Sequence, residues 1–182
     1  MNVFQVMSDV FKQAGTIPVL ISGFAANYYK VSRQTADADF MIDEEGFPRI
    51  RALMEKKGFI TALKQNVFAQ MKPASPGLLM DVDFMFVDKK TLDQIVTEGR
   101  KIKIAGCEFT VPSLMHLIAL KLHSIKYNPA LREIRDLSDI IELIRQNGLK
   151  VDDAEFKELC LKYGTLELYG KILEKAGSPW KI

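Results

Sequence analysis

The fold is decided by residues 19–42, which read VLISGFAANYYKVSRQTADADFMI. A short apolar run, residues 19–21, ends at the small residues Ser22 and Gly23, which break the strand and lead into a helical pattern. Residues 37–42 then alternate acidic and apolar side chains, which is typical of a strand with two different faces. The stretch therefore predicts a strand, a tight turn into a helix, and a second strand with one acidic face.

Two strands carry paired carboxylates. Residues i and i+2 of a strand point to the same face, so Asp37 and Asp39 project together, as do Asp81 and Asp83. Two like charges ~4 Å apart repel by about 4 kcal/mol at an effective dielectric constant of ~20. Either some of these groups stay protonated or a cation lies among them, and oxygen ligands favour Mg²⁺ or Mn²⁺. A solvated strand edge is the alternative interpretation of each pair.

The turn between the first strand and the following helix could bind phosphate. Gly23 lets the backbone approach a ligand closely, and a helix N-terminus offers N–H groups to an anion. Ser22 could add its hydroxyl as a donor. The alternative is a tight turn that binds nothing.

Periodicity along the rest of the chain predicts an α/β (α+β) fold, with a mixed sheet flanked by helices over residues 1–111 and a helical region over residues 112–182. Helices are predicted over residues 3–14, 24–29, 48–57, 89–98, 112–126, 130–146, 152–162 and 165–176. Strands are predicted over residues 59–70 (one or two), 78–87, 101–104 and 108–111, with a loop at 72–77.

Composition excludes several classes of protein. With 182 residues, 48% hydrophobic and 26% charged, the chain resembles an ordinary globular domain or a core with a small appendage. A formal net charge of +2 does not by itself indicate nucleic acid or a membrane as partner. The two cysteines lack zinc-site spacing. Because there is neither a signal-peptide pattern nor an apolar run long enough to span a bilayer, we expect a cytoplasmic protein.

The motifs together resemble the signature of DNA polymerase β-like nucleotidyltransferases, most nearly the small bacterial and archaeal proteins related to abortive-infection and toxin–antitoxin nucleotidyltransferases. The resemblance lies in residues 19–26, in Tyr28 and in Arg33-Gln-Thr-Ala-Asp-Ala-Asp-Phe40. It continues in Val82-Asp83-Phe84 and, more loosely, in three helical segments. These are Val111-Pro-Ser-Leu114, Leu120-Lys-Leu122 and Arg135-Asp-Leu-Ser-Asp-Ile140. About residues 17–145 are covered.

The resemblance implies a role for each carboxylate. Asp37 and Asp39 would ligate Mg²⁺ or Mn²⁺. Asp83 would be the third carboxylate, shared between a metal ion and activation of the nucleophile. Asp81 remains the alternative third carboxylate, because the sequence places it on the same face as Asp83.

The resemblance also implies a nucleotide site. Ser22 and Gly23 would hold the phosphates, Arg33 and Thr35 would shape the active-site loop, and Lys121 would reach the triphosphate. A solvated helix lysine is the alternative interpretation of Lys121. Ser22 departs from the family pattern, which has glycine at this place, so the departure can also mark weakened binding.

Three functions are compatible with these residues. The first is a metal-dependent nucleotidyltransferase that transfers a nucleoside monophosphate from an NTP to an RNA, protein or small-molecule acceptor, with an antitoxin as a possible partner. The second is a weakly active or inactive relative that binds a nucleotide or a partner protein. The third, a metal-dependent nuclease, has less support because the chain lacks the lysine adjacent to the carboxylates that many such nucleases use. In the helical region, Asp136 and Asp139 are predicted to pair with Arg132 or Arg135.

Overall fold

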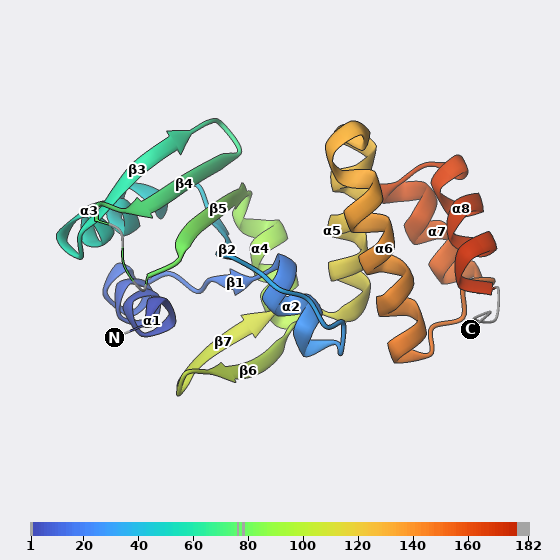
Figure 1. Ribbon diagram of the computed structural model, residues 1–182, viewed down its shortest axis with the longest axis horizontal. Coiled ribbons are helices and arrows are strands. Elements are labelled where there is room, and N and C mark those ends of the chain that lie inside the picture. Colours follow the sequence, from blue (N-terminus) through green and yellow to red (C-terminus); the bar gives the residue numbers. More distant parts are fainter. Residues whose placement is uncertain (1, 76, 78, 178–182) are drawn as a thin grey trace. The chain divides into compact units, whose positions relative to one another are not determined.

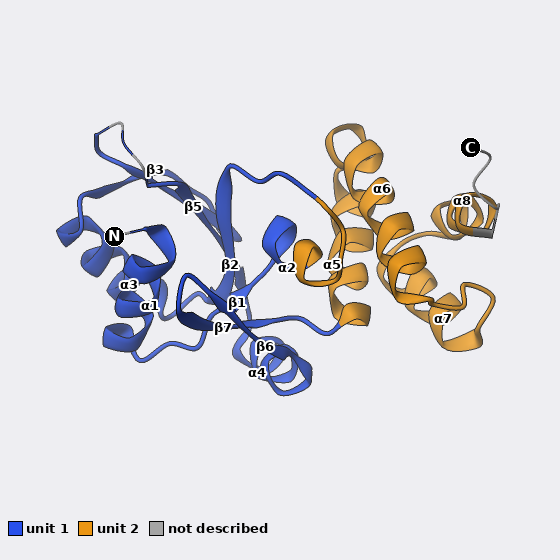
Figure 2. Ribbon diagram, turned by 60° about the horizontal axis from the view of Figure 1, so that its bottom comes forward, with its two compact units in different colours: residues 1–25, 33–113 blue, residues 26–32, 114–182 orange. Residues whose placement is uncertain are grey.

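The chain forms two compact units, shown in different colours in Figure 2. One hydrogen bond explains why an early segment belongs to the second unit: the Asn147 side chain donates from Nδ2 to the backbone carbonyl of Tyr29 over 3.0 Å. Unit 1 comprises residues 1–25 and 33–113, and unit 2 comprises residues 26–32 and 114–182. The computed structural model describes residues 2–75, 77 and 79–177.

Unit 1 is built on a seven-stranded mixed sheet with the order β3-β4-β5-β2-β1-β7-β6. The pairs β2–β5 and β1–β7 are parallel and the other neighbouring pairs are antiparallel, so the predicted α/β class with a mixed sheet is confirmed. The strands are β1 (Val19–Leu20), β2 (Asp37–Asp43), β3 (Phe59–Lys64), β4 (Phe68–Pro73), β5 (Asp81–Val87), β6 (Arg100–Ile104) and β7 (Cys107–Val111).

Strand β4 is where the sequence prediction differs most from the structure. Residues 59–70 form parts of two strands, and β4 continues to Pro73 instead of giving way to a loop at Lys72. Pairing explains the extension, because Lys72 lies opposite Ile60 and Pro73 lies opposite Phe59 in the antiparallel β3–β4 ladder. The ladder therefore overrides the local turn signal of the proline.

The starts of one helix and one strand also differ from the sequence prediction. Helix α2 (Ser22–Tyr28) begins at Ser22 and not at Phe24, so the strand–helix turn contains no residue between the buried Ile21 and the first helical turn. Strand β5 begins at Asp81 rather than at residue 78, which lies outside the described residues. Both shifts bring a candidate site residue to the very start of its element.

One face of the sheet carries an aromatic core beneath α1 (Val3–Ala14) and α3 (Phe47–Lys56). The ring of Phe11 from α1 lies 5.0 Å from that of Phe40, and the ring of Phe47 from α3 lies 5.5 Å from that of Phe84. Phe40 lies in β2 and Phe84 in β5, and successive side chains of a strand alternate between faces, so the aspartates of these two strands lie on the opposite face. Helix α4 (Lys89–Glu98) completes this unit and contacts β1 and β2.

Unit 2 consists mainly of helices joined by short connections, as Figure 1 shows. Its long helices are α5 (Leu114–Tyr127), α6 (Pro129–Asn147), α7 (Ala154–Tyr163) and α8 (Leu166–Gly177), all within two residues of the predicted bounds. Helix α5 packs on α6 and α7, and α8 packs on the same two helices. Among the described residues, no helix combines the length and the apolar character that crossing a membrane requires.

Candidate metal and nucleotide site

Four carboxylates lie on the face of the sheet opposite the aromatic core. Strands β2 and β5 are parallel neighbours in a register that sets Asp37 opposite Asp81 and Asp39 opposite Asp83. Asp37, Asp39 and Asp83 each bring one carboxylate oxygen within 4.8 Å of the other two. Asp81 lies outside this group and forms an ion pair with Lys72, its Oδ2 lying 3.3 Å from Nζ. We call Asp37, Asp39 and Asp83 the acidic triad.

The environment of Asp83 resists an isolated negative charge. Burial raises the pKa of the Asp83 carboxyl above its usual range, and the nearby charges of Asp37 and Asp81 raise it further. A hydrogen bond from Gln70 Nε2 to Asp83 Oδ1, 3.0 Å long, acts in the opposite direction. A set of oxygen donors that repel one another on a half-buried surface fits a hard divalent cation such as Mg²⁺ or Mn²⁺.

The turn residues predicted from sequence contact the triad through Thr35. The Thr35 hydroxyl lies 3.1 Å from both the carbonyl oxygen and Oδ1 of Asp37, so it can donate to either. Gly23 packs directly on Thr35, because a Cβ added to Gly23 would lie 2.8 Å from Thr35 Cβ. Glycine is therefore required at position 23 for a steric reason, and the predicted turn supports the loop that orients Asp37.

Ser22 and Arg33 flank this contact. Ser22 has a φ of 54°, in the left-handed region that favours glycine, which accounts for the glycine of the family pattern at this place. Arg33 is partly buried in the segment that connects α2 to β2. The strained backbone of Ser22 is thus a cost that the structure tolerates at the edge of the candidate site.

Sequence reasoning missed Gln70 and Lys72, which lie on β4 beside the two carboxylates of β5. Their i, i+2 spacing was visible, but their pairing with β5 depends on a ladder between distant segments. The argument that no lysine adjoins the carboxylates was wrong, since Lys72 does so in space. That argument therefore gives no reason to reject a nuclease.

Lys121 is not a solvated helix lysine. It lies on α5 in unit 2, is 5% exposed, and its Nζ lies 2.6 Å from Asp139 Oδ2 and 3.2 Å from Asp136 Oδ1. The sequence predicted that Arg132 or Arg135 would pair with these carboxylates. In the structure, Asp136 and Asp139 both accept from Lys121, which lies 15 and 18 residues before them in the chain. A role for Lys121 at the triphosphate stays a prediction.

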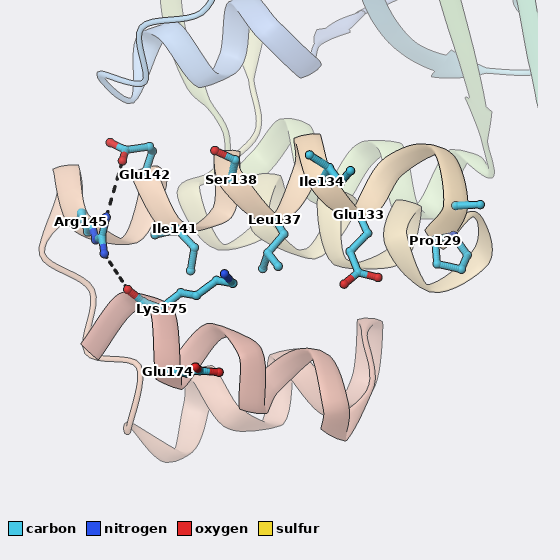
Figure 3. Close-up of a pocket in the computed structure, with 11 residues that line it drawn as sticks. Pro129, Glu133, Ile134, Leu137, Ser138, Ile141, Glu142, Arg145, Glu174 and Lys175 are labelled. Atoms are coloured by element: carbon cyan, nitrogen blue, oxygen red, sulfur yellow. Dashed lines mark hydrogen bonds and ion pairs between the residues drawn. The ribbon is translucent and has the colours of Figure 1, made fainter. Parts of the chain in front are cut away.

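Unit 2 also contains an open groove of about 900 Å³ between α6 and α8, shown in Figure 3. Leu137 and Ile141 point from α6 toward α8, and Arg145 holds one end through the Lys175 carbonyl oxygen at 2.6 Å. Ile134 on the groove's wall is 92% exposed. The groove is amphipathic and contains none of the residues of the acidic triad.

Comparison with known proteins agrees with this geometry. A family model described as an uncharacterised nucleotidyltransferase matches residues 25–179, which include the acidic triad. No curated protein matches the chain. The match leaves the abortive-infection or toxin–antitoxin subgroup a prediction.

Several solved structures share the fold. The solution structure of the antibiotic-resistance factor ANT(2″)-Ia has a TM-score of 0.63 at 14% identity and covers 96% of this chain and 97% of that one. A crystal structure of ANT(2″)-Ia with adenylyl-2″-tobramycin has a TM-score of 0.61 at 13% identity, covering 87% and 96%. An antigenic nucleotidyltransferase-like protein from Paracoccidioides brasiliensis has a TM-score of 0.58 at 18% identity, covering 96% and 89%.

Proposed function

This chain belongs to that family of nucleotidyltransferases, and we propose that it transfers a nucleoside monophosphate from an NTP to a hydroxyl or phosphate acceptor. One observation carries the proposal: Asp37, Asp39 and Asp83 converge from two parallel strands to within 4.8 Å. Three carboxylates on one half-buried face are costly unless a cation joins them, so the arrangement supports metal-dependent chemistry.

Asp37, Asp39 and Asp83 would hold Mg²⁺ or Mn²⁺, while Asp81 stays paired with Lys72. Bound there, the ions would orient the triphosphate and neutralise the charge that develops during transfer. The Thr35 hydroxyl keeps Asp37 in place, and Gly23 supports Thr35. The three carboxylates would thus bind the metal ions, while their neutral neighbours would orient the carboxylates.

The nucleotide phosphates would lie at Ser22 and Gly23, and Arg33 would contribute positive charge to the same loop. Lys121 remains a candidate contact to the triphosphate. In the transfer itself, a bond forms between the acceptor oxygen and the α-phosphorus, and the bond to the β-phosphate oxygen breaks to release pyrophosphate. A hydroxyl acceptor would pass its proton to the Asp83 carboxylate.

The acceptor would be a small molecule, an RNA end or a protein side chain. ANT(2″)-Ia, which shares the fold, was crystallised with an adenylylated tobramycin, and this favours testing small hydroxyl compounds first. The NTP substrate would place the reaction in the cytoplasm. Membership of the toxin–antitoxin subgroup would add an antitoxin partner, which co-expression with neighbouring genes would reveal.

Nucleotide binding without transfer is the second candidate function. The observation that favours it is Ser22, which takes the place of the family's first glycine and adopts a φ of 54°. A strained, bulkier residue at the turn would hold the phosphates less closely than glycine. Binding would then persist while the rate of transfer falls.

The thermal midpoint of the protein with each NTP, with and without Mg²⁺ or Mn²⁺, tests the proposal. Specific binding to the folded state raises the midpoint, and the rise should require both metal and nucleotide. Replacing Asp37 and Asp39 together with alanine should remove it. Labelled NTPs with tobramycin, total tRNA or the protein alone then distinguish transfer from binding. A metal-dependent rise equal in the double variant and the wild type would refute the site.

A further inference from the structure

Strand β4 provides a different partner for each carboxylate of β5. The antiparallel register sets Gln70 opposite Asp83, and Gln70 Nε2 donates to Asp83 Oδ1 over 3.0 Å. Two residues further along β4, Lys72 Nζ lies 3.3 Å from Asp81 Oδ2. The two pairs are therefore neighbours on one face of the sheet, with an amide on one carboxylate and an ammonium on the other.

The two partners have opposite consequences for a metal ion. An amide orients a carboxylate through one oxygen without cancelling its charge, so Asp83 keeps its charge and its Oδ2 for a cation. An ammonium beside Asp81 offsets the charge of that carboxylate and repels a second cation. Asp81 also lies outside the acidic triad, although it shares a face and a strand with Asp83.

We propose that β4 selects the third metal-binding carboxylate: Gln70 is a positioning residue that presents Asp83, and Lys72 withholds Asp81. This inference deepens the proposed function and rests on it, since it concerns the same site. The selection is made by two side chains spaced i, i+2 on a strand that contributes no carboxylate of its own to the triad.

Binding of Mn²⁺ to the nucleotide-free protein, followed by the electron paramagnetic resonance signal of free Mn²⁺, tests the selection. Gln70→Leu removes the donor, and Gln70→Lys replaces it with a cation. Lys72→Gln frees Asp81. Two surface variants that lose the same kinds of contact serve as matched controls: Gln94→Leu, whose amide donates to Glu98, and Lys101→Gln, whose ammonium faces Glu108.

The dissociation constant should rise about tenfold in Gln70→Leu, the size of effect expected when the partner that orients a ligand is lost, and further in Gln70→Lys. In Lys72→Gln it should stay within about fivefold of wild type or tighten, because that pair is solvent-exposed. Both controls should match the wild type. Wild-type affinity in Gln70→Lys, or weaker binding in Lys72→Gln than in Gln70→Leu, would overturn the selection. The Lys72 and Gln70→Lys variants keep the test informative if Gln70→Leu fails to fold.

A metal-free measurement separates the inference from the proposed function. The side-chain amide resonances of Gln70 should shift more in Asp83→Ala than in Asp81→Ala, and the Lys72 side-chain resonances should shift more in Asp81→Ala than in Asp83→Ala. Any other pattern overturns the selection and leaves the proposed function intact. If the pattern is as expected but the wild type binds no Mn²⁺, the proposed function fails, and the inference fails with it.

Discussion

The molecule contains two groups of carboxylates that differ in how their charge is compensated. In unit 2, Asp136 and Asp139 are buried and share the ammonium of Lys121, itself 5% exposed. In unit 1, the acidic triad is half-buried, and the donors to Asp37 and Asp83 are the Thr35 hydroxyl and the Gln70 amide, both neutral. We call the first group the lysine cluster.

This difference in the partners of the carboxylates helps to distinguish a structural acidic cluster from a functional one. An ammonium between two carboxylates compensates them within the protein, and the lysine cluster thereby joins α5 to α6. The neutral donors to Asp37 and Asp83 orient these carboxylates without adding a positive charge beside them. On this ground the acidic triad is the candidate catalytic site and the lysine cluster is part of the core of unit 2.

Removing Lys121 should have the largest effect on stability. Lys121→Met removes the buried ammonium that both carboxylates bond to and should lower the free energy of unfolding by about 3–5 kcal/mol. The thermal midpoint should fall by roughly 10 °C or more. Lys89→Met, which loses only an exposed pair with Asp93, is the control and should cost less than about 1 kcal/mol. A Lys121→Met midpoint equal to the control's would contradict a structural role.

Adding a methyl group at Gly23 should have an intermediate effect. The new Cβ would lie 2.8 Å from Thr35 Cβ, so Gly23→Ala should cost about 1–3 kcal/mol and displace the hydroxyl from Asp37. Nucleotide transfer should fall with it. Gly170→Ala is the control, because Gly170 lies in α8 with nothing within 4 Å of its added Cβ. That variant should gain about 0.5–1 kcal/mol in chemical denaturation, and equal changes in the two variants would exclude the steric explanation.

Neutralising Asp83 should have the smallest effect on stability. Unlike the two substitutions above, it should stabilise the metal-free protein. Because the pKa of Asp83 is raised in the folded state, that group's contribution to stability is full below the unfolded pKa and is lost as the pH rises through the folded pKa. Metal-free Asp83→Asn should therefore melt above the wild type at pH 7, with the difference closing as the pH falls below the usual aspartate pKa of about 4.

If the triad binds Mg²⁺, adding the metal should make the wild type more stable than Asp83→Asn. Added Mg²⁺ and NTP should raise the wild-type midpoint and leave that of Asp83→Asn unchanged. Lys89→Met is the control, since this variant and the wild type should respond equally to the metal. An Asp83→Asn protein that is less stable than wild type at pH 7 without metal would show that the triad is already compensated within the chain.

The sequence predicted the helices and strands well, but it predicted poorly which side chains contact one another. The i, i+2 spacing of Asp37 and Asp39, the glycine before them and the helical period after residue 112 each depend on neighbours in the chain. The contact partners of Asp83 and of Lys121, in contrast, do not depend on neighbours in the chain. Gln70 and Asp83 are 13 residues apart, and Lys121 and Asp139 are 18 apart. Ranking Asp83 above Asp81 needed the ladder between β4 and β5.

By itself the sequence determined the fold class, the acidic strands and the turn that precedes them, because alternation and turn chemistry are local properties of the backbone. Only the tertiary structure decided what each charged group faces. It paired Lys121 with Asp136 and Asp139, and it brought Lys72 to Asp81. Electrostatic compensation depends on distance in space, and a sheet or a helix pair brings together groups whose separation along the chain carries no such information.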